Sequence, residues 1–73
     1  MELLVFGASG RVGRRVCAYA VSDGHSVTAF VRDAARAPDG VAVIEGDVTD
    51  PAAVAAAVTG QDAVCSALEP GDD

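Results

Sequence analysis

The 73-residue sequence contains no lysine, and only 4% of its residues are aromatic. Its five basic residues are all arginines, and eleven acidic residues bring the formal net charge to −6. Such an acidic chain lacks the basic face that general binding to nucleic acid or anionic membranes requires. No apolar stretch approaches the roughly 18 residues of a membrane span, and the first residues lack a signal-peptide pattern. We therefore expect neither a nucleic-acid partner nor a membrane, and a cytoplasmic location.

Residue types that would carry catalysis or hold a metal are also scarce. Cys17 and Cys65 have no CxxC spacing and no group of histidines beside them, so metal and disulfide-scaffold sites are weakly indicated. Both are interpreted as buried thiols in a reducing cytoplasm, with a redox role as the alternative. Tyr19 has no lysine with which to form a catalytic pair. His25 is interpreted as a turn residue, so no catalytic residue is predicted.

Short apolar runs alternate with a helical periodicity. Four of them have the character of strands buried on both faces. They cover residues 3–6, 27–31, 41–44 and 63–67. A helix is expected over 11–22, where apolar residues recur every three or four positions, and Gly24 is expected to end it. A second helix is expected over 52–58, because Asp50 can cap it and Pro51 is suited to its first position.

This order of elements predicts an α/β fold with a parallel sheet, right-handed crossovers and strand order 3-2-1-4. It is the first half of a Rossmann-type doubly wound sheet, and residues 1–73 are expected to form one domain of this kind. The fourth strand is apolar, yet nothing after it covers its outer edge. We therefore expect an N-terminal fragment of a longer domain. Through that edge it would associate with itself or with a missing C-terminal half.

The stretch VFGASGRVG joins the first expected strand to the first expected helix. Its glycines follow a G-x-x-G-x-x-G variant of the dinucleotide fingerprint. Gly7 permits a tight turn, Gly10 lets backbone N–H groups approach a pyrophosphate, and Gly13 lets the helix pack closely. The helix N-terminus and the Ser9 hydroxyl would add hydrogen-bond donors. The alternative is an ordinary strand–turn–helix without a ligand.

Arginines occur where the 2′-phosphate of NADP would lie. Arg32 and Arg36 follow the second expected strand, and Val31 ends that strand in place of the acid that typically holds an unphosphorylated ribose. A guanidinium matches a phosphate with two parallel hydrogen bonds, and Arg11 could reach the same region. The alternative is that Arg32 and Arg36 are solvated loop residues paired with neighbouring aspartates. The pattern favours NADP(H), with NAD(H) possible.

Asp47 follows the third expected strand in the motif EGDVTD. At the carboxyl edge of the sheet, its carboxylate could accept a hydrogen bond from an adenine amino group. It could equally satisfy local backbone N–H groups in a turn. The sequence leaves both interpretations open.

Four segments in this order and spacing resemble the atypical short-chain dehydrogenase/reductase family: LLVFGASGRVG, GHSVTAFVRD, VIEGDVTD and GQDAVCSAL. The likeness is greatest to its NAD(P)H-binding branch, which includes biliverdin/flavin reductases and NmrA-like regulators. The resemblance implies that these segments hold, in turn, the pyrophosphate, the 2′-phosphate, the adenine and the nicotinamide ribose. The matching residues are Gly7, Ser9, Gly10, Arg11, Val12, Gly13, Arg32, Arg36, Asp47, Val48, Ala67 and Leu68.

The resemblance also implies a function: the NADP(H)-binding portion of a small cytoplasmic oxidoreductase. Its acceptors would be flavin-, quinone- or tetrapyrrole-like molecules, or nucleoside-sugar-type substrates. The alternatives are an NmrA-like regulator that senses the dinucleotide without turnover, and an inactive truncated product. Glu69 and Pro70 stand where relatives carry a glycine and a small polar residue, which departs from the family pattern. Because family members continue well beyond this length, we expect the chain alone not to catalyse reduction.

Overall fold

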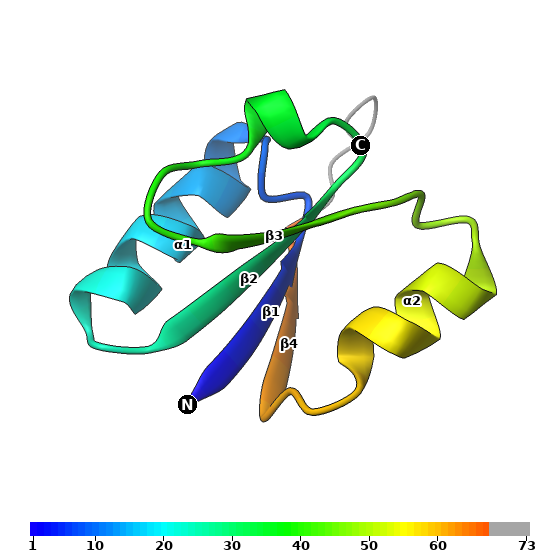
Figure 1. The fold of residues 1–73 in the computed structure, drawn as a ribbon. Helices are drawn as coiled ribbons and strands as arrows, with labels where there is room; N and C mark the ends of the chain where they lie inside the picture. The colour runs from blue at the N-terminus through cyan, green and yellow to red at the C-terminus, as the bar shows by residue number, and fades with distance from the viewer. Residues whose placement is uncertain (68–73) are drawn as a thin grey trace.

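A computed structural model describes residues 1–67, which form a four-stranded sheet flanked by helices (Figure 1). In chain order the elements are β1 Glu2–Phe6, α1 Arg11–Ser22, β2 Ser26–Val31, the 3₁₀ helix η1 Ala34–Arg36, β3 Ala42–Glu45, α2 Pro51–Val58 and β4 Ala63–Ser66. All strand pairs are parallel, and the strand order is β3-β2-β1-β4. The predicted α/β class and strand order 3-2-1-4 are therefore confirmed.

The strands differ slightly from the apolar runs that predict them. In β1, Glu2 pairs with Ser26 of β2, and at the other end of β2, Val31 pairs with Glu45 of β3. These polar residues belong to the sheet because strand pairing uses backbone groups, whatever the side chain. β4 ends at Ser66, one residue before the expected end.

Two apolar layers cover opposite faces of the sheet, since successive residues of a strand point to opposite sides. On one face, Cys17 of α1 is buried against Val5 of β1 and its neighbours. On the other face, Leu4 and Phe30 form a buried cluster with Ala57 of α2. The two helices therefore lie on opposite sides of the sheet, as Figure 1 shows.

The predicted helix boundaries follow from identifiable residues. The Asp50 carboxylate accepts hydrogen bonds from the N–H groups of Ala52, at 3.1 Å, and Ala53, at 3.4 Å. Pro51 occupies the first turn of α2. Gly24 follows α1 with a φ of +87°, a conformation that glycine adopts without the steric penalty of a side chain. The expected cap of α2 and the expected end of α1 are both confirmed.

The two cysteines are free thiols in different surroundings. Cys17 is buried on α1, and burial is the main reason that the pKa of its thiol is raised. Nearby Cys65 raises the Cys17 pKa further, and Arg14 opposes this shift. Cys65 itself is only partly buried, so the expectation of two buried thiols is wrong for this residue. It lies on β4, where the open side of an edge strand leaves even an inward-facing side chain accessible to solvent.

We expect Gly13→Ala to destabilise the fold. In an unobstructed helix interior, this exchange would stabilise by roughly 1 kcal/mol, because alanine restricts the unfolded chain. Here the added Cβ would overlap the Gly7 carbonyl oxygen and lie 2.8 Å from the Cα of Ala8, so the backbone must shift. Such overpacking costs about 1–3 kcal/mol. Urea denaturation followed by circular dichroism measures the net change.

Gly24→Ala is the control for this variant. A Cβ there meets nothing within 4 Å, but the positive φ is retained, so only backbone strain of about 1–2 kcal/mol is expected. A Gly13→Ala variant more stable than the parent would show that helix propensity outweighs the contact with Gly7.

Candidate dinucleotide-binding site

Three loops meet at the carboxyl edge of the sheet. They follow β1, β2 and β3, and because these strands are parallel neighbours, the loops leave the sheet at the same end. Figure 1 shows η1 and the start of α1 together at this end. In open parallel sheets, ligands bind at this edge. The structure therefore brings the predicted glycine, arginine and aspartate segments to one place.

The first loop presents the N-terminus of α1. Gly7 has a φ of +73°, and the turn is closed by a 3.1 Å hydrogen bond from the Gly10 N–H to the Gly7 carbonyl oxygen. Gly10 is the N-cap of α1 and has extended backbone angles, with no side-chain oxygen accepting from the first turn. The N–H groups of that turn and the helix dipole suit an anion.

Side chains around this N-terminus are open to solvent. Arg11 is exposed and Val12 is 49% exposed, while Ser9 is partly buried in the turn before them. Gly13 lies against the backbone of Gly7 and Ala8. The helix is thus packed closely against its own preceding loop, which fixes the direction in which its N–H groups point.

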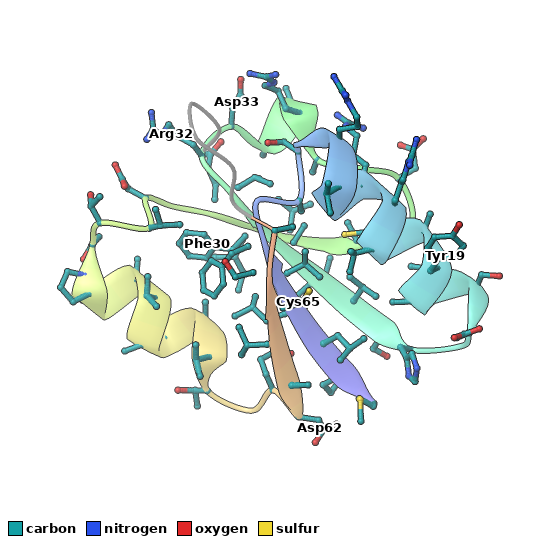
Figure 2. All side chains as sticks on the ribbon, turned by 180° about the vertical axis from the view of Figure 1, so that it is seen from behind. Tyr19, Phe30, Arg32, Asp33, Asp62 and Cys65 are labelled. Atoms are coloured by element: carbon teal, nitrogen blue, oxygen red, sulfur yellow. The ribbon has the colours of Figure 1, made fainter. Side chains whose placement is uncertain are left out.

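The second loop carries Arg32, which lies before η1, and Arg36, which ends η1, and both side chains are exposed. Figure 2 shows Arg32 and Asp33 at the same end of the sheet as the start of α1. Asp33 accepts a 3.0 Å hydrogen bond from the Ala35 N–H, and Glu45 accepts a 2.8 Å bond from the N–H that begins η1. Asp33 and Glu45 therefore hold the backbone of this loop.

A small pocket lies between the second and third loops. Its lining comprises Phe30, Arg32, Gly46 and Val48. A Cβ on Gly46 would lie 2.8 Å from the Phe30 ring, so glycine is needed to keep this wall in place. An apolar wall beside a guanidinium suits a flat aromatic group, on which an arginine can stack. Gly46 and Phe30 are not among the site residues predicted from the sequence, although a glycine directly after a strand in EGDVTD is a usable signal.

Asp47 has the turn role that the sequence leaves open. One carboxylate oxygen accepts from both the N–H of Thr49, at 2.9 Å, and its hydroxyl, at 2.8 Å. These two bonds are the main causes that lower the pKa of Asp47, and the positive charge of Arg32 adds to them. The local interpretation is confirmed, and the contact with adenine stays a prediction.

The end of β4 lies beside the end of β1. The Ala67 N–H donates a 2.9 Å hydrogen bond to the Phe6 carbonyl oxygen, and Ala67 is buried. This places Ala67 next to the glycine loop, and its contact with the nicotinamide ribose stays a prediction. Leu68, the last predicted site residue, lies outside the described residues.

Arg14 is a further residue of the site that is not predicted from the sequence. Its guanidinium binds the carbonyl oxygens of Ser9 and Arg36, which belong to the first and second loops. No local signal reveals this, because the partners come together only when the sheet forms. Within residues 1–67, no group of acidic, histidine and cysteine side chains could hold a metal ion. No helix among these residues is long and apolar enough to cross a membrane.

We expect Thr49→Val to raise the pKa of Asp47 toward its ordinary value of 3.8, because the hydroxyl donor is lost. Since the folded-state pKa is lowered, its contribution to stability is present above the unfolded pKa and is lost as the pH falls through the lowered value. A carbon-detected NMR titration of the carboxyl group measures the shift. Thr59→Val, which removes a hydroxyl bonded to the Ala55 carbonyl, is the control. An unchanged Asp47 pKa in Thr49→Val would contradict the assignment.

Several known proteins are similar to this chain in sequence or in fold. A 2-alkyl-3-oxoalkanoate reductase from Stenotrophomonas maltophilia is 44% identical over 68 residues, covering 88% of this chain and 20% of that protein. A solved short-chain dehydrogenase/reductase superfamily protein from Agrobacterium tumefaciens, with bound NAD, is 32% identical with a TM-score of 0.78. That match covers 90% of this chain and 20% of the other.

A solved structure of a candidate NADH-flavin reductase from Streptococcus pneumoniae is 34% identical, with a TM-score of 0.80. The match covers 94% of this chain and 31% of that one. The chain thus spans about a fifth to a third of the length of these proteins. Residues 7–73 match the model of a family described as NAD(P)H-binding. Together with the Rossmann-type sheet and its glycine loop, this match shows that the chain belongs to the NAD(P)H-binding family, among relatives that include short-chain dehydrogenases/reductases.

Proposed function

We propose that this chain is the NADP(H)-binding portion of an NAD(P)-dependent oxidoreductase. The observation that carries the proposal is the meeting of an uncapped helix N-terminus with Arg32 and Arg36 at one edge of the sheet. A reductase and a candidate flavin reductase among its relatives support an organic acceptor. We infer acceptors that are flavin-, quinone- or tetrapyrrole-like, or nucleoside-sugar-type substrates.

The dinucleotide would lie along the carboxyl edge. Its pyrophosphate would meet the loop and first turn of α1. Arg32 and Arg36 would hold the 2′-phosphate, and the adenine would pack against the apolar wall between the second and third loops, beside Asp47 and Val48. The nicotinamide ribose would lie near Ala67. When bound, the cofactor supplies a hydride, and the residues of this chain bind and orient it.

The hydrogen bonds that Asp33 and Glu45 already make support a preference for NADP(H) over NAD(H). Asp33 and Glu45 accept hydrogen bonds from η1, whereas the exposed arginines offer a two-pronged match to a phosphate. NAD(H) is the second candidate, because a solved relative carries bound NAD. An NmrA-like regulator that binds the dinucleotide without turnover would use these same residues. An NADPH-oxidation assay with flavin and quinone acceptors distinguishes it from a reductase.

The open edge of β4 is the proposed surface for a further strand, from a second copy or from a longer chain. Val64 on this strand is 47% exposed, and β4 pairs only with β1 within the described residues. A cytoplasmic location is part of the same proposal, supported by two free thiols.

We expect the parent chain to bind NADP⁺ at least about tenfold more tightly than NAD⁺. One charge-assisted contact contributes about 1.5–3 kcal/mol, which corresponds to roughly tenfold to a hundredfold in affinity. Arg36→Ala should reduce binding of NADP⁺ and leave NAD⁺ nearly unaffected. Arg32→Ala should reduce binding of NADP⁺ more than that of NAD⁺, because Arg32 also lines the wall proposed for the adenine that both cofactors carry. Calorimetric titrations of both cofactors measure this. Arg15→Ala removes the same charge from an exposed position on α1 and is the control. Equal parent affinities for the two cofactors would contradict the preference.

We expect Gly10→Val to weaken binding of either dinucleotide by at least about tenfold, or about 1.4 kcal/mol. Valine can adopt the extended backbone at this position, with φ −79° and ψ 172°, but its side chain would stand beside the N–H groups that meet the pyrophosphate. Valine is also a poorer N-cap, so circular dichroism must confirm folding. Gly24→Ala strains the other end of α1 and controls for lost stability. Undiminished binding by folded Gly10→Val would show that the loop is only a turn.

A further inference from the structure

Arg14 connects the two loops that would hold the phosphates. Its Nε donates to the Ser9 carbonyl oxygen at 3.1 Å, and a terminal nitrogen donates to the Arg36 carbonyl oxygen at 2.7 Å. Ser9 belongs to the glycine loop, and Arg36 ends η1. The shorter distance is typical of a charge-assisted hydrogen bond. One side chain thus ties the start of α1 to the segment after β2.

This connection is specific to the guanidinium. Among the described residues, Arg14 makes the single hydrogen bond between residues 7–22 and residues 33–40. A guanidinium presents several N–H donors in a fixed plane, and so it can satisfy two separate carbonyls at once. Ala37, just after η1, packs on the apolar cluster beneath α1, which anchors the same segment from its other side.

The bond to Arg36 involves its backbone and leaves its side chain available. The Arg36 side chain is exposed and makes no hydrogen bond or ion pair within residues 1–67. Fixing the backbone at this point limits where the guanidinium can reach. A loop that is ordered before binding loses less conformational entropy when its ligand arrives.

We propose that Arg14 is a positioning residue that sets the spacing between the glycine loop and Arg36, and thereby strengthens the preference for NADP(H) over NAD(H). The inference rests on the proposed 2′-phosphate role of Arg36. Arg14 acts through two backbone carbonyls, and its charge is directed at these oxygens. Its loss therefore alters the selection of the cofactor as well as the overall affinity.

The first test compares Arg14→Gln and Arg14→Lys with the parent chain, by titrating NADP⁺ and NAD⁺. The ratio of the two affinities should fall by at least about threefold in both variants, within the range expected for residues coupled in one network. Lysine retains the charge but not the two-pronged geometry, so an unchanged ratio in Arg14→Lys overturns the inference. Arg15→Gln, an equal loss of charge nearby, should leave the ratio unchanged. Circular dichroism confirms that each variant is folded.

A double-mutant cycle tests the route through Arg36. Arg36→Ala should lower the affinity for NADP⁺ in the parent chain. In a chain that already carries Arg14→Gln, the fold-loss caused by Arg36→Ala should be smaller by a factor of at least about three. An equal effect in both backgrounds overturns the positioning role and leaves the proposed function standing. No effect of Arg36→Ala in the parent overturns the 2′-phosphate assignment and, with it, this inference.

Discussion

The contact between Gly13 and the backbone of Gly7 and Ala8 determines where α1 begins. No side chain fits at position 13, because a Cβ there would overlap the Gly7 carbonyl oxygen. Gly7, in turn, adopts a positive φ that redirects the chain directly after β1. Together the two glycines bring the helix N-terminus back over the carboxyl edge of the sheet. The anion-binding character of this edge depends on that close packing, since the donors of the first turn are backbone N–H groups.

Polar contacts help to hold the second and third loops in place. Asp33 and Glu45 order η1, and Asp47 orders the turn at Thr49, all through carboxylates that accept N–H groups. Such bonds allow an exposed loop to keep a defined shape without burying much surface. Arg14 connects the second loop to the glycine loop through its hydrogen bonds to the Arg36 and Ser9 carbonyl oxygens. The loops of the site are therefore connected by its acids and by Arg14.

The sequence predicts most of this fold because its strongest signals are local. Apolar runs and helical periodicity give the strands and helices, and Asp50 gives the start of α2. The polar strand ends, Glu2 and Glu45, are missed because they are held by backbone pairing with another strand. The 3₁₀ helix η1 is missed since one of its two stabilising acids comes from β3. In each case, the missing information is a contact between segments that are distant in sequence.

In the candidate site, too, the residues with local signals are predicted from the sequence, and those that depend on distant contacts are not. Glycines at fixed spacing and arginines after a strand are readable from the sequence, because each chemical role belongs to the residue itself. The Phe30–Gly46 wall and the Arg14 bridge are not, because their roles arise from a partner on another element. Asp47 lies between these two cases. The sequence indicates either adenine or local backbone as its partner, and the structure shows the local contact with Thr49.

Charge distribution explains how a chain with a net charge of −6 can suit an anionic ligand. Its only cationic side chains are the five arginines, apart from any charge on His25, and three of them lie in the first five residues of α1. Of the other two, Arg32 precedes η1 and Arg36 ends it, so all five are near the carboxyl edge. The helix dipole adds positive potential at the same end. At this edge, Asp33, Glu45 and Asp47 accept hydrogen bonds from backbone N–H groups. The positive side chains are therefore concentrated at the edge where an anionic ligand would bind, and the local charge, more than the net charge, governs the approach of a charged ligand.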